Sequence, residues 1–365
     1  MECLEKPAWN RFTRKKLEQI VIGEPDADVR NRILQTWDTV AKPLDGMGKF
    51  ETLTAQIGAV LGTENIDISR KAVIIMCADN GIVEENVTQT GQEITARVAA
   101  AMGKRTSCVG RMAKIVGAET IPVDIGINSM EKIDGVLDRK VRCGTRNFSK
   151  EPAMTEEEAI AAIAVGIDMV KECKKDGYTI LATGEMGIGN TTTSSAITAA
   201  LLHCEVSQVT GRGAGLSGEG LIHKQQVILE AIQKYDLYHK DALTVLKTVG
   251  GFDIAGLAGV CMGGAIYHVP IVLDGVISMV SALLAERILP GTKAYLLPSH
   301  KGKEPAVELL MKELGLEPVI DANLALGEGS GAVMMFSLLD IALGAYGNRT
   351  TFSELQMKPY RRFET

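Results

Sequence analysis

The chain has 365 residues, of which 46% are hydrophobic and 23% are charged. This length allows one large domain, or a large and a small one, and the composition is that of an ordinary soluble globular protein. The formal net charge of −6 argues against nucleic-acid binding, which usually needs a clustered basic surface. No apolar run approaches the roughly 20 residues that span a bilayer, so no membrane-spanning segment is predicted. Seven scattered cysteines without a CxxC pair favour reduced thiols in a cytoplasm.

The N-terminal part of the chain is expected to be helical. Apolar residues recur at helical spacing through residues 11–62, and Pro43 and Gly46 interrupt the pattern. We therefore predict that residues 1–65 form a small helical domain together with about 335–365, beside a large α/β domain over 66–334.

Five apolar runs are predicted to be buried strands, and long helical patterns separate them. The runs span residues 71–81, 119–127, 178–184, 269–275 and 292–298. The helical pattern over 155–177 opens with Thr155 three residues before Glu158, which is typical of a capping box. This alternation predicts a doubly wound, Rossmann-like parallel sheet that binds its ligands at the carboxyl ends of the strands.

A glycine-rich segment, GEMGIGNTT, follows the third run. Gly187 and Gly189 would let backbone N–H groups approach an anion, while Asn190 and Thr191 add donors at a helix N-terminus. The segment predicts a phosphate cradle, although a tight strand–helix turn explains it equally well. Glu185 would repel a phosphate, so we expect it to face another part of the ligand, such as a sugar hydroxyl or an azole N–H.

A second glycine cluster, TGRGAGL, contains Arg212 and Gly213, and Lys224 lies in the predicted helix beyond it. The two cations could neutralise a phosphate that the first loop only hydrogen-bonds. A flexible surface loop with solvated cations is an equally good interpretation.

The third cluster, LGEGSGA, places Glu328 between Gly327 and Gly329 in an otherwise apolar context. Apolar surroundings raise the pKa of a carboxyl group, which suits a general base that works near neutral pH. The alternative is that Glu328 merely caps the following helix. The five histidines show no metal-ligand spacing, so no metal site is predicted.

Together these motifs resemble one family, the nicotinate mononucleotide:5,6-dimethylbenzimidazole phosphoribosyltransferases that activate the lower ligand of cobalamin. GEMGIGNTT is the most characteristic string of that family, and matching segments run in order from about residue 30 to 355. They include KPLDGMGKFETLTAQIGAV (42–60), CADNGIVEENVTQTGQEIT (77–95), VGGFDIAGLAG (249–259), VPIVLDGVIS (269–278) and LALGEGSGA (324–332).

The resemblance implies a cytoplasmic, homodimeric enzyme that moves phosphoribose from nicotinate mononucleotide to 5,6-dimethylbenzimidazole or a related base. The products are α-ribazole 5′-phosphate and nicotinate, and neither a cofactor nor a metal takes part. By resemblance, Glu328 is the catalytic base and Glu185 lies near the base and the ribose. The implied substrate-binding residues are Gln92, Asp79, Gly187, Gly189, Asn190, Thr191, Arg212, Gly213, Lys224 and Asp253, with Gln92 in the base pocket.

Two departures from the family pattern leave the acceptor open. Asn80 stands where the family usually has histidine, and NVTQTGQ lacks the common aromatic residue or proline before its glutamine. The acceptor could therefore be another benzimidazole, an adenine or a phenol. One alternative function is a non-catalytic or partner-dependent paralogous subunit that acts on phenolic or other lower-ligand bases. A dinucleotide-dependent oxidoreductase is disfavoured, because no GxGxxG follows the first strand.

Overall fold

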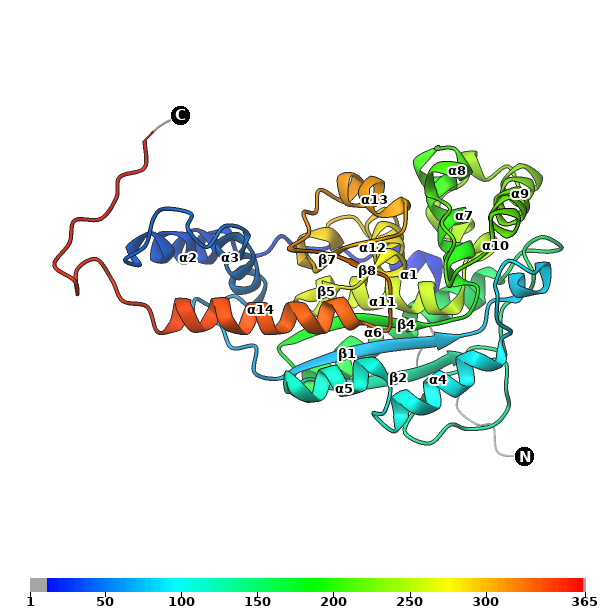
Figure 1. The fold of residues 1–365 in the computed structure, drawn as a ribbon, viewed down its shortest axis with the longest axis horizontal. Coiled ribbons are helices and arrows are strands. Elements are labelled where there is room, and N and C mark those ends of the chain that lie inside the picture. Colours follow the sequence, from blue (N-terminus) through cyan, green and yellow to red (C-terminus); the bar gives the residue numbers. More distant parts are fainter. Residues whose placement is uncertain (1–11, 364–365) are drawn as a thin grey trace.

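The computed structural model describes residues 12–363 and has a six-stranded, fully parallel sheet at its centre (Figure 1). The strands lie in the order β3-β2-β1-β4-β5-β6. They are β1 (Lys71–Ala78), β2 (Glu119–Gly126), β3 (Leu137–Asp138), β4 (Ile180–Met186), β5 (Ile271–Leu273) and β6 (Leu296–Pro298). This order winds outward in both directions from β1 and β4, so the predicted doubly wound, Rossmann-like sheet is confirmed.

The predicted strands mostly match the observed ones, with a correction at the last run. Thr292–Tyr295 forms a 3₁₀ helix, and the strand begins only at Leu296. A second, two-stranded parallel sheet of β7 (His300–Gly302) and β8 (Ile320–Leu324) was not predicted. Its strands are short and half exposed, so they lack the apolar run that marks the central strands.

The two faces of the sheet are covered by different helices, because side chains alternate along β1. Ala72, Ile74 and Met76 join one buried cluster. Val73, Ile75 and Cys77 join the other. On the first face, α11 (Phe252–Tyr267) and α12 (Val276–Ile288) contact the strands, and the same buried cluster extends outward to α6 (Glu156–Lys175), α7 (Asn190–Leu202), α8 (Val206–Val209), α9 (Gly218–Lys234), α10 (Ala242–Val249) and α13 (Ala306–Leu314). The second packs against α3 (Lys49–Leu61), α4 (Glu93–Gly103), α5 (Cys108–Ile115) and α14 (Ser330–Gly347).

Helix α6 begins as its sequence predicts. The Thr155 hydroxyl accepts from the backbone N–H of Glu158 at 3.1 Å, and the Glu158 carboxylate accepts from the N–H of Thr155 at 2.8 Å. This reciprocal pair confirms the capping box.

Helices α2 (Ala27–Thr39) and α3 meet the C-terminal end of the chain at one end of the molecule, whereas α1 (Arg14–Glu18) lies apart from them, with Leu17 in the buried cluster of the first face (Figure 1). Pro43 and Gly46 lie between α2 and α3 as predicted. Trp37 of α2 packs beside Tyr346 of α14, and Val40 pairs with Thr351 of the C-terminal segment. The proposed division into domains stays a prediction, and residues 1–11 of its first segment lie outside the described residues.

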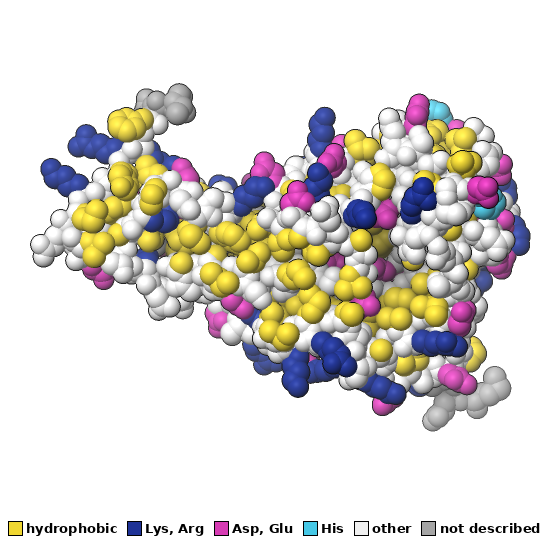
Figure 2. Space-filling model, in the orientation of Figure 1, with side chains coloured by type: hydrophobic (Ala, Val, Ile, Leu, Met, Phe, Trp, Pro, Cys, Tyr) yellow, Lys and Arg dark blue, Asp and Glu magenta, His cyan; other side chains and the backbone are white. Residues whose placement is uncertain are grey.

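Helix α14 has an apolar surface as well as a buried face. Figure 2 shows hydrophobic side chains gathered along this helix and toward the C-terminal segment. By length and composition alone α14 could cross a membrane, and half of it is buried within the protein. The cysteines between residues 12 and 363 are all free, and Cys3 lies outside that range.

Candidate functional site

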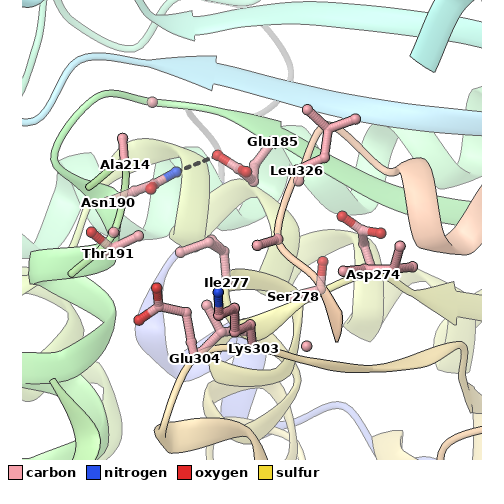
Figure 3. Close-up of a pocket in the computed structure, with 18 of the residues that line it drawn as sticks. Glu185, Asn190, Thr191, Ala214, Asp274, Ile277, Ser278, Lys303, Glu304 and Leu326 are labelled. Carbon is pink, nitrogen blue, oxygen red and sulfur yellow. Dashed lines mark hydrogen bonds between the residues drawn. The ribbon is translucent and has the colours of Figure 1, made fainter. Parts of the chain in front are cut away.

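A cavity of about 260 Å³ opens at the carboxyl ends of β4 and β5 (Figure 3). Its lining comes mainly from residues 185–188, 274–278, 302–304 and 324–327, with His300. A smaller cavity of about 70 Å³ adjoins it and shares Gly187, Asn190, Thr191 and Gly213 with it. The structure therefore brings the first two glycine clusters of the sequence to one place, at the edge of the sheet where ligands were expected.

A buried lysine lies behind Thr191 and Gly213, which line both cavities, and is not itself part of either lining. Lys224 is fully buried, and its ammonium donates to Thr191 Oγ1 at 2.9 Å and to the Gly211 carbonyl oxygen at 3.2 Å. Burial lowers the pKa of Lys224 to about 8. Gly213 has a φ of +53°, and an added Cβ there would lie 2.8 Å from Thr191 Oγ1. Glycine thus leaves space beside a hydroxyl and an ammonium, which suits the close approach of an anion.

The other predicted cation, Arg212, is turned toward its own loop. It lines the smaller cavity, and its guanidinium donates to the Leu216 carbonyl oxygen at 2.7 Å. Gln89 lines the same cavity and donates to the Gly215 carbonyl oxygen. Gln89 was not among the predicted site residues, and no pattern in its surroundings distinguishes it from Gln92 three residues later.

Two carboxyl groups lie on either side of Asn190. The Asn190 amide nitrogen donates both to Glu185, which lines the larger cavity, and to Asp253 Oδ2 at 3.1 Å. Burial, with Asp253 nearby, raises the pKa of Glu185 to about 8, and burial raises the pKa of Asp253 to about 6. Glu185 therefore carries a proton at neutral pH, which removes the repulsion expected between its carboxylate and a phosphate. Asp253 is fully buried and lines neither cavity.

Glu328 lies in a turn of three consecutive residues with left-handed backbone. The φ values are +80° at Gly327, +63° at Glu328 and +93° at Gly329. Such a conformation costs a non-glycine residue about 1–2 kcal/mol, so the surrounding structure must hold it. Gly327 lines the larger cavity, and a Cβ added at Gly327 would lie 2.6 Å from Glu185 Oε1. The first and third glycine motifs are thus in direct contact.

The Glu328 carboxylate is half-buried at the start of α5. It accepts from the backbone N–H of Val109 at 3.3 Å, and burial raises its pKa above the ordinary value of 4.5. Its side chain is not part of the lining of either cavity. The alternative that Glu328 caps the helix after it is wrong, because its carboxylate contacts α5 and another acid caps α14.

That other acid is Asp274, which the sequence analysis missed. Asp274 is buried, and its carboxylate accepts from the N–H groups of Gly329 at 3.1 Å, Gly331 at 2.8 Å and Ala332 at 3.2 Å. It follows β5 and also lines the larger cavity. The run ending LDG was expected at the ligand-binding edge, but nothing in the sequence links it to a turn more than 50 residues later. Asp274 fixes the start of α14 and with it the turn that carries Glu328.

Asp79 and Gln92 lie one layer behind the cavities. Asp79 is buried and accepts from the N–H of Asn128 at 2.7 Å, and Gln92 donates to the Asn80 carbonyl oxygen at 3.0 Å. Neither residue lines either cavity, and the role of Gln92 in a base pocket stays a prediction. Asn80 is itself buried, and its amide nitrogen donates to the Ile188 carbonyl oxygen at 3.4 Å.

Within the part of the chain that the structure describes, no cluster of three His, Cys, Asp or Glu side chains could hold a metal ion. His300 lines the larger cavity, but its Nδ1 is within hydrogen-bonding distance of Ser299 Oγ, at 2.9 Å. Lys303 and Glu304 also line this cavity. No sequence pattern singled them out, because they follow the unpredicted strand β7.

Comparison with known proteins identifies the family. A family model described as phosphoribosyltransferase matches residues 22–357. The nicotinate-nucleotide–dimethylbenzimidazole phosphoribosyltransferase of Clostridium perfringens strain 13 is 43% identical over 325 residues, which cover 89% of each chain. The chain belongs to this phosphoribosyltransferase family.

Other members of the phosphoribosyltransferase family agree with this assignment in sequence and in structure. The Clostridium acetobutylicum protein of the same name is 42% identical over 336 residues, covering 92% of this chain and 96% of its own. The crystal structure of CobT from Thermus thermophilus matches with a TM-score of 0.86 at 34% identity, covering 91% of this chain and 99% of that one. The predicted family is therefore confirmed, and the shared fold extends over nearly the whole chain.

Proposed function

We propose that this phosphoribosyltransferase moves phosphoribose from nicotinate mononucleotide to 5,6-dimethylbenzimidazole or a related base, giving α-ribazole 5′-phosphate and nicotinate. The observation that carries the proposal is the pair of adjoining cavities. They combine a buried lysine beside Thr191 and Gly213 with the carboxyl group of Glu185 and the turn that carries Glu328. The relatives supply the substrates, since they bear the name of the enzyme rather than of a non-catalytic subunit.

The phosphate would bind where the cavities meet. Lys224 supplies the charge, Thr191 a hydroxyl, and the loop through Gly187 and Gly189 supplies backbone N–H groups at the start of α7. Arg212 precedes Gly213 in the chain. Its guanidinium would reach the phosphate if the side chain rotated away from the Leu216 carbonyl oxygen. Protonated Glu185 would lie beside the ribose as a hydrogen-bond donor rather than as a repelling anion.

The chemical step needs a base and correct orientation. Glu328 takes the proton from one ring nitrogen of the acceptor, and the other nitrogen attacks the anomeric carbon of the ribose. The bond from that carbon to the pyridinium nitrogen breaks, and its electron pair returns to the nitrogen, so nicotinate leaves without further protonation. Attack opposite the leaving group inverts the β-nucleotide to the α-product. Orientation can contribute about 7–11 kcal/mol to such a step, so neither a metal nor a cofactor is required.

The direct test mixes the purified chain with nicotinate mononucleotide and 5,6-dimethylbenzimidazole and measures nicotinate and α-ribotide by mass spectrometry. We expect both products in equal amounts. A panel of other benzimidazoles, adenine and phenols then establishes the preferred acceptor, which the loop around Asn80 leaves open. Failure of the purified chain with every acceptor would contradict the proposal, and activity only after a related chain is added would support a partner-dependent subunit.

The apolar face of α14 supports the proposal that the protein is a homodimer. Met334 is 40% exposed and Ile341 is 67% exposed on this helix, and Leu355, Met357 and Tyr360 continue the exposed apolar surface along the C-terminal segment (Figure 2). Contiguous exposed apolar surface commonly marks an interface between protein chains. Light scattering after size-exclusion chromatography should give twice the mass of one chain, and Ile341→Asp should lower that mass. A monomer at micromolar concentration would rule out this part of the proposal.

A further inference from the structure

Lys303 is a lysine of the larger cavity with no role in the function proposed above. It follows β7, and its backbone N–H donates to the Leu324 carbonyl oxygen at 3.1 Å, so the small β7–β8 sheet fixes where the side chain begins. Figure 3 shows Lys303 next to Glu304 among the side chains that line the cavity.

The Lys303 ammonium has no charged partner among the described side chains that line this cavity. Glu185, Asp274 and Glu304 contribute carboxyl groups to the lining, and Lys303 is the only lysine or arginine among the described lining residues. Its ammonium makes no hydrogen bond or ion pair with any residue between 12 and 363. Glu304 does not pair with it, because the Glu304 carboxyl group lies against Gly211, on the side of Lys224. Lys303 is exposed, so its ammonium is available to a ligand.

The phosphate already has its own cation. Lys224 of α9 is buried against Thr191 of α7, which lines both cavities. A ligand with one anionic group would need nothing more. Nicotinate mononucleotide has a second anionic group, the carboxylate on its pyridine ring, and the carboxylates of Asp274 and Glu304 in the lining would repel it anywhere except near a positive charge.

We propose that Lys303 binds the ring carboxylate of nicotinate mononucleotide and so selects this substrate over the corresponding amide, nicotinamide mononucleotide. The inference rests on the proposed function and adds the residue that recognises the leaving group. An ammonium and a carboxylate form a charge-assisted hydrogen bond, whereas a neutral carboxamide gains much less from the same lysine. Loss of one such bond lowers binding roughly tenfold to a hundredfold.

The test compares Lys303→Met, which removes the charge, with Lys303→Arg, which keeps it. Lys301→Met is the matched control, because Lys301 is two residues away, forms an ion pair with Glu308 and does not line the cavity. For each variant, kcat/KM is measured with nicotinate mononucleotide and with nicotinamide mononucleotide. We expect Lys303→Met to lose about tenfold to a hundredfold with the nicotinate substrate and less than about threefold with the amide. Lys303→Arg and Lys301→Met should keep the preference of the unchanged chain.

The outcomes of this test distinguish the role of Lys303 from the proposed function. Equal losses with both substrates would mean that Lys303 contacts the phosphate they share, and no loss with either would mean that it contacts neither; both results overturn the inference. Calorimetric titration of the unchanged chain and of Lys303→Met with the two nucleotides gives the same comparison without turnover. An unchanged chain that turns over the nicotinate substrate while Lys303→Met keeps its preference refutes the role of Lys303 and leaves the proposed function intact.

Discussion

Replacing Asp274 with asparagine tests whether this buried carboxylate holds the turn that carries Glu328. The substitution keeps the shape of the side chain and removes its charge. Three backbone N–H groups, at Gly329, Gly331 and Ala332, now donate to a carboxylate. The amide of asparagine has one oxygen and one NH₂ group. Its oxygen can accept from at most two of the three N–H groups, and its NH₂ group then faces the third N–H, donor against donor.

The expected loss in the free energy of unfolding follows from these three hydrogen bonds. A hydrogen bond to a charged acceptor contributes about 1 kcal/mol more than one to a neutral acceptor, so two weakened bonds cost about 2 kcal/mol. The third N–H is left buried without an acceptor, which costs about 1–3 kcal/mol more. We therefore expect Asp274→Asn to lower the free energy of unfolding by about 3–5 kcal/mol, measured by urea denaturation at pH 7.

Activity should fall as well. Displacement of a catalytic group by about 1 Å can cost a hundredfold in rate, so a loosened turn should lower kcat at least tenfold under conditions where Asp274→Asn is folded. Asp241→Asn is the matched control, since Asp241 caps α10 through the N–H groups of Leu243 and Thr244 and lines neither cavity. Asparagine caps an exposed helix about as well as aspartate, so this control should change neither quantity. If Asp274→Asn kept its stability within about 1 kcal/mol and its kcat within about twofold, roughly the scatter of neutral surface substitutions, Asp274 would not hold the turn.

Two further predictions follow from the shifted pKa values. Lys224→Met should raise KM for nicotinate mononucleotide about tenfold or more. The unchanged chain should bind this substrate less tightly above pH 8, where Lys224 loses its proton. A KM of the unchanged chain that stays constant from pH 7 to 9 would contradict this prediction. The fold raises the pKa of Glu185 from 4.5 to about 8, so the native state holds the proton more tightly, and stability should decline as pH rises from about 5 to 8. Glu185→Gln should flatten that decline in urea denaturation curves, and an unaltered slope would show that Glu185 is not protonated in the fold.

The sheet could be predicted because its central strands are buried on both faces. All eight residues of β1 are buried, so the strand stands out as an apolar run between polar segments. Strand β8 has no such run, since three of its five residues are exposed, and the small sheet, whose strand β7 precedes Lys303, was missed for that reason. The last central strand was predicted too long, because a buried 3₁₀ turn at Thr292–Tyr295 has the same apolar pattern as a strand.

The site was predictable where one segment carried the whole pattern. The loop through Gly187 and Asn190 is continuous in sequence, and the raised pKa expected for Glu328 agrees with its burial in the structure. Asp274 could not be recognised, because its three partners lie beyond position 328 and only the fold brings them together. Asp253 was named only through the family resemblance, because its place behind Asn190 depends on how α11 packs against the sheet.

The rate of α-ribotide formation by Glu328→Gln tests the central claim that this glutamate removes the proton of the acceptor. Glutamine keeps the size of the side chain and can still accept the N–H of Val109, so the unfolding midpoint should not change. At pH 7 we expect turnover to fall at least about a hundredfold, the usual scale of general-base catalysis. In the unchanged chain the rate should also decline on the acid side at a pH above 4.5, because burial raises the pKa of Glu328 and its protonated form cannot act as a base. Equal turnover by Glu328→Gln and the unchanged chain would contradict the account.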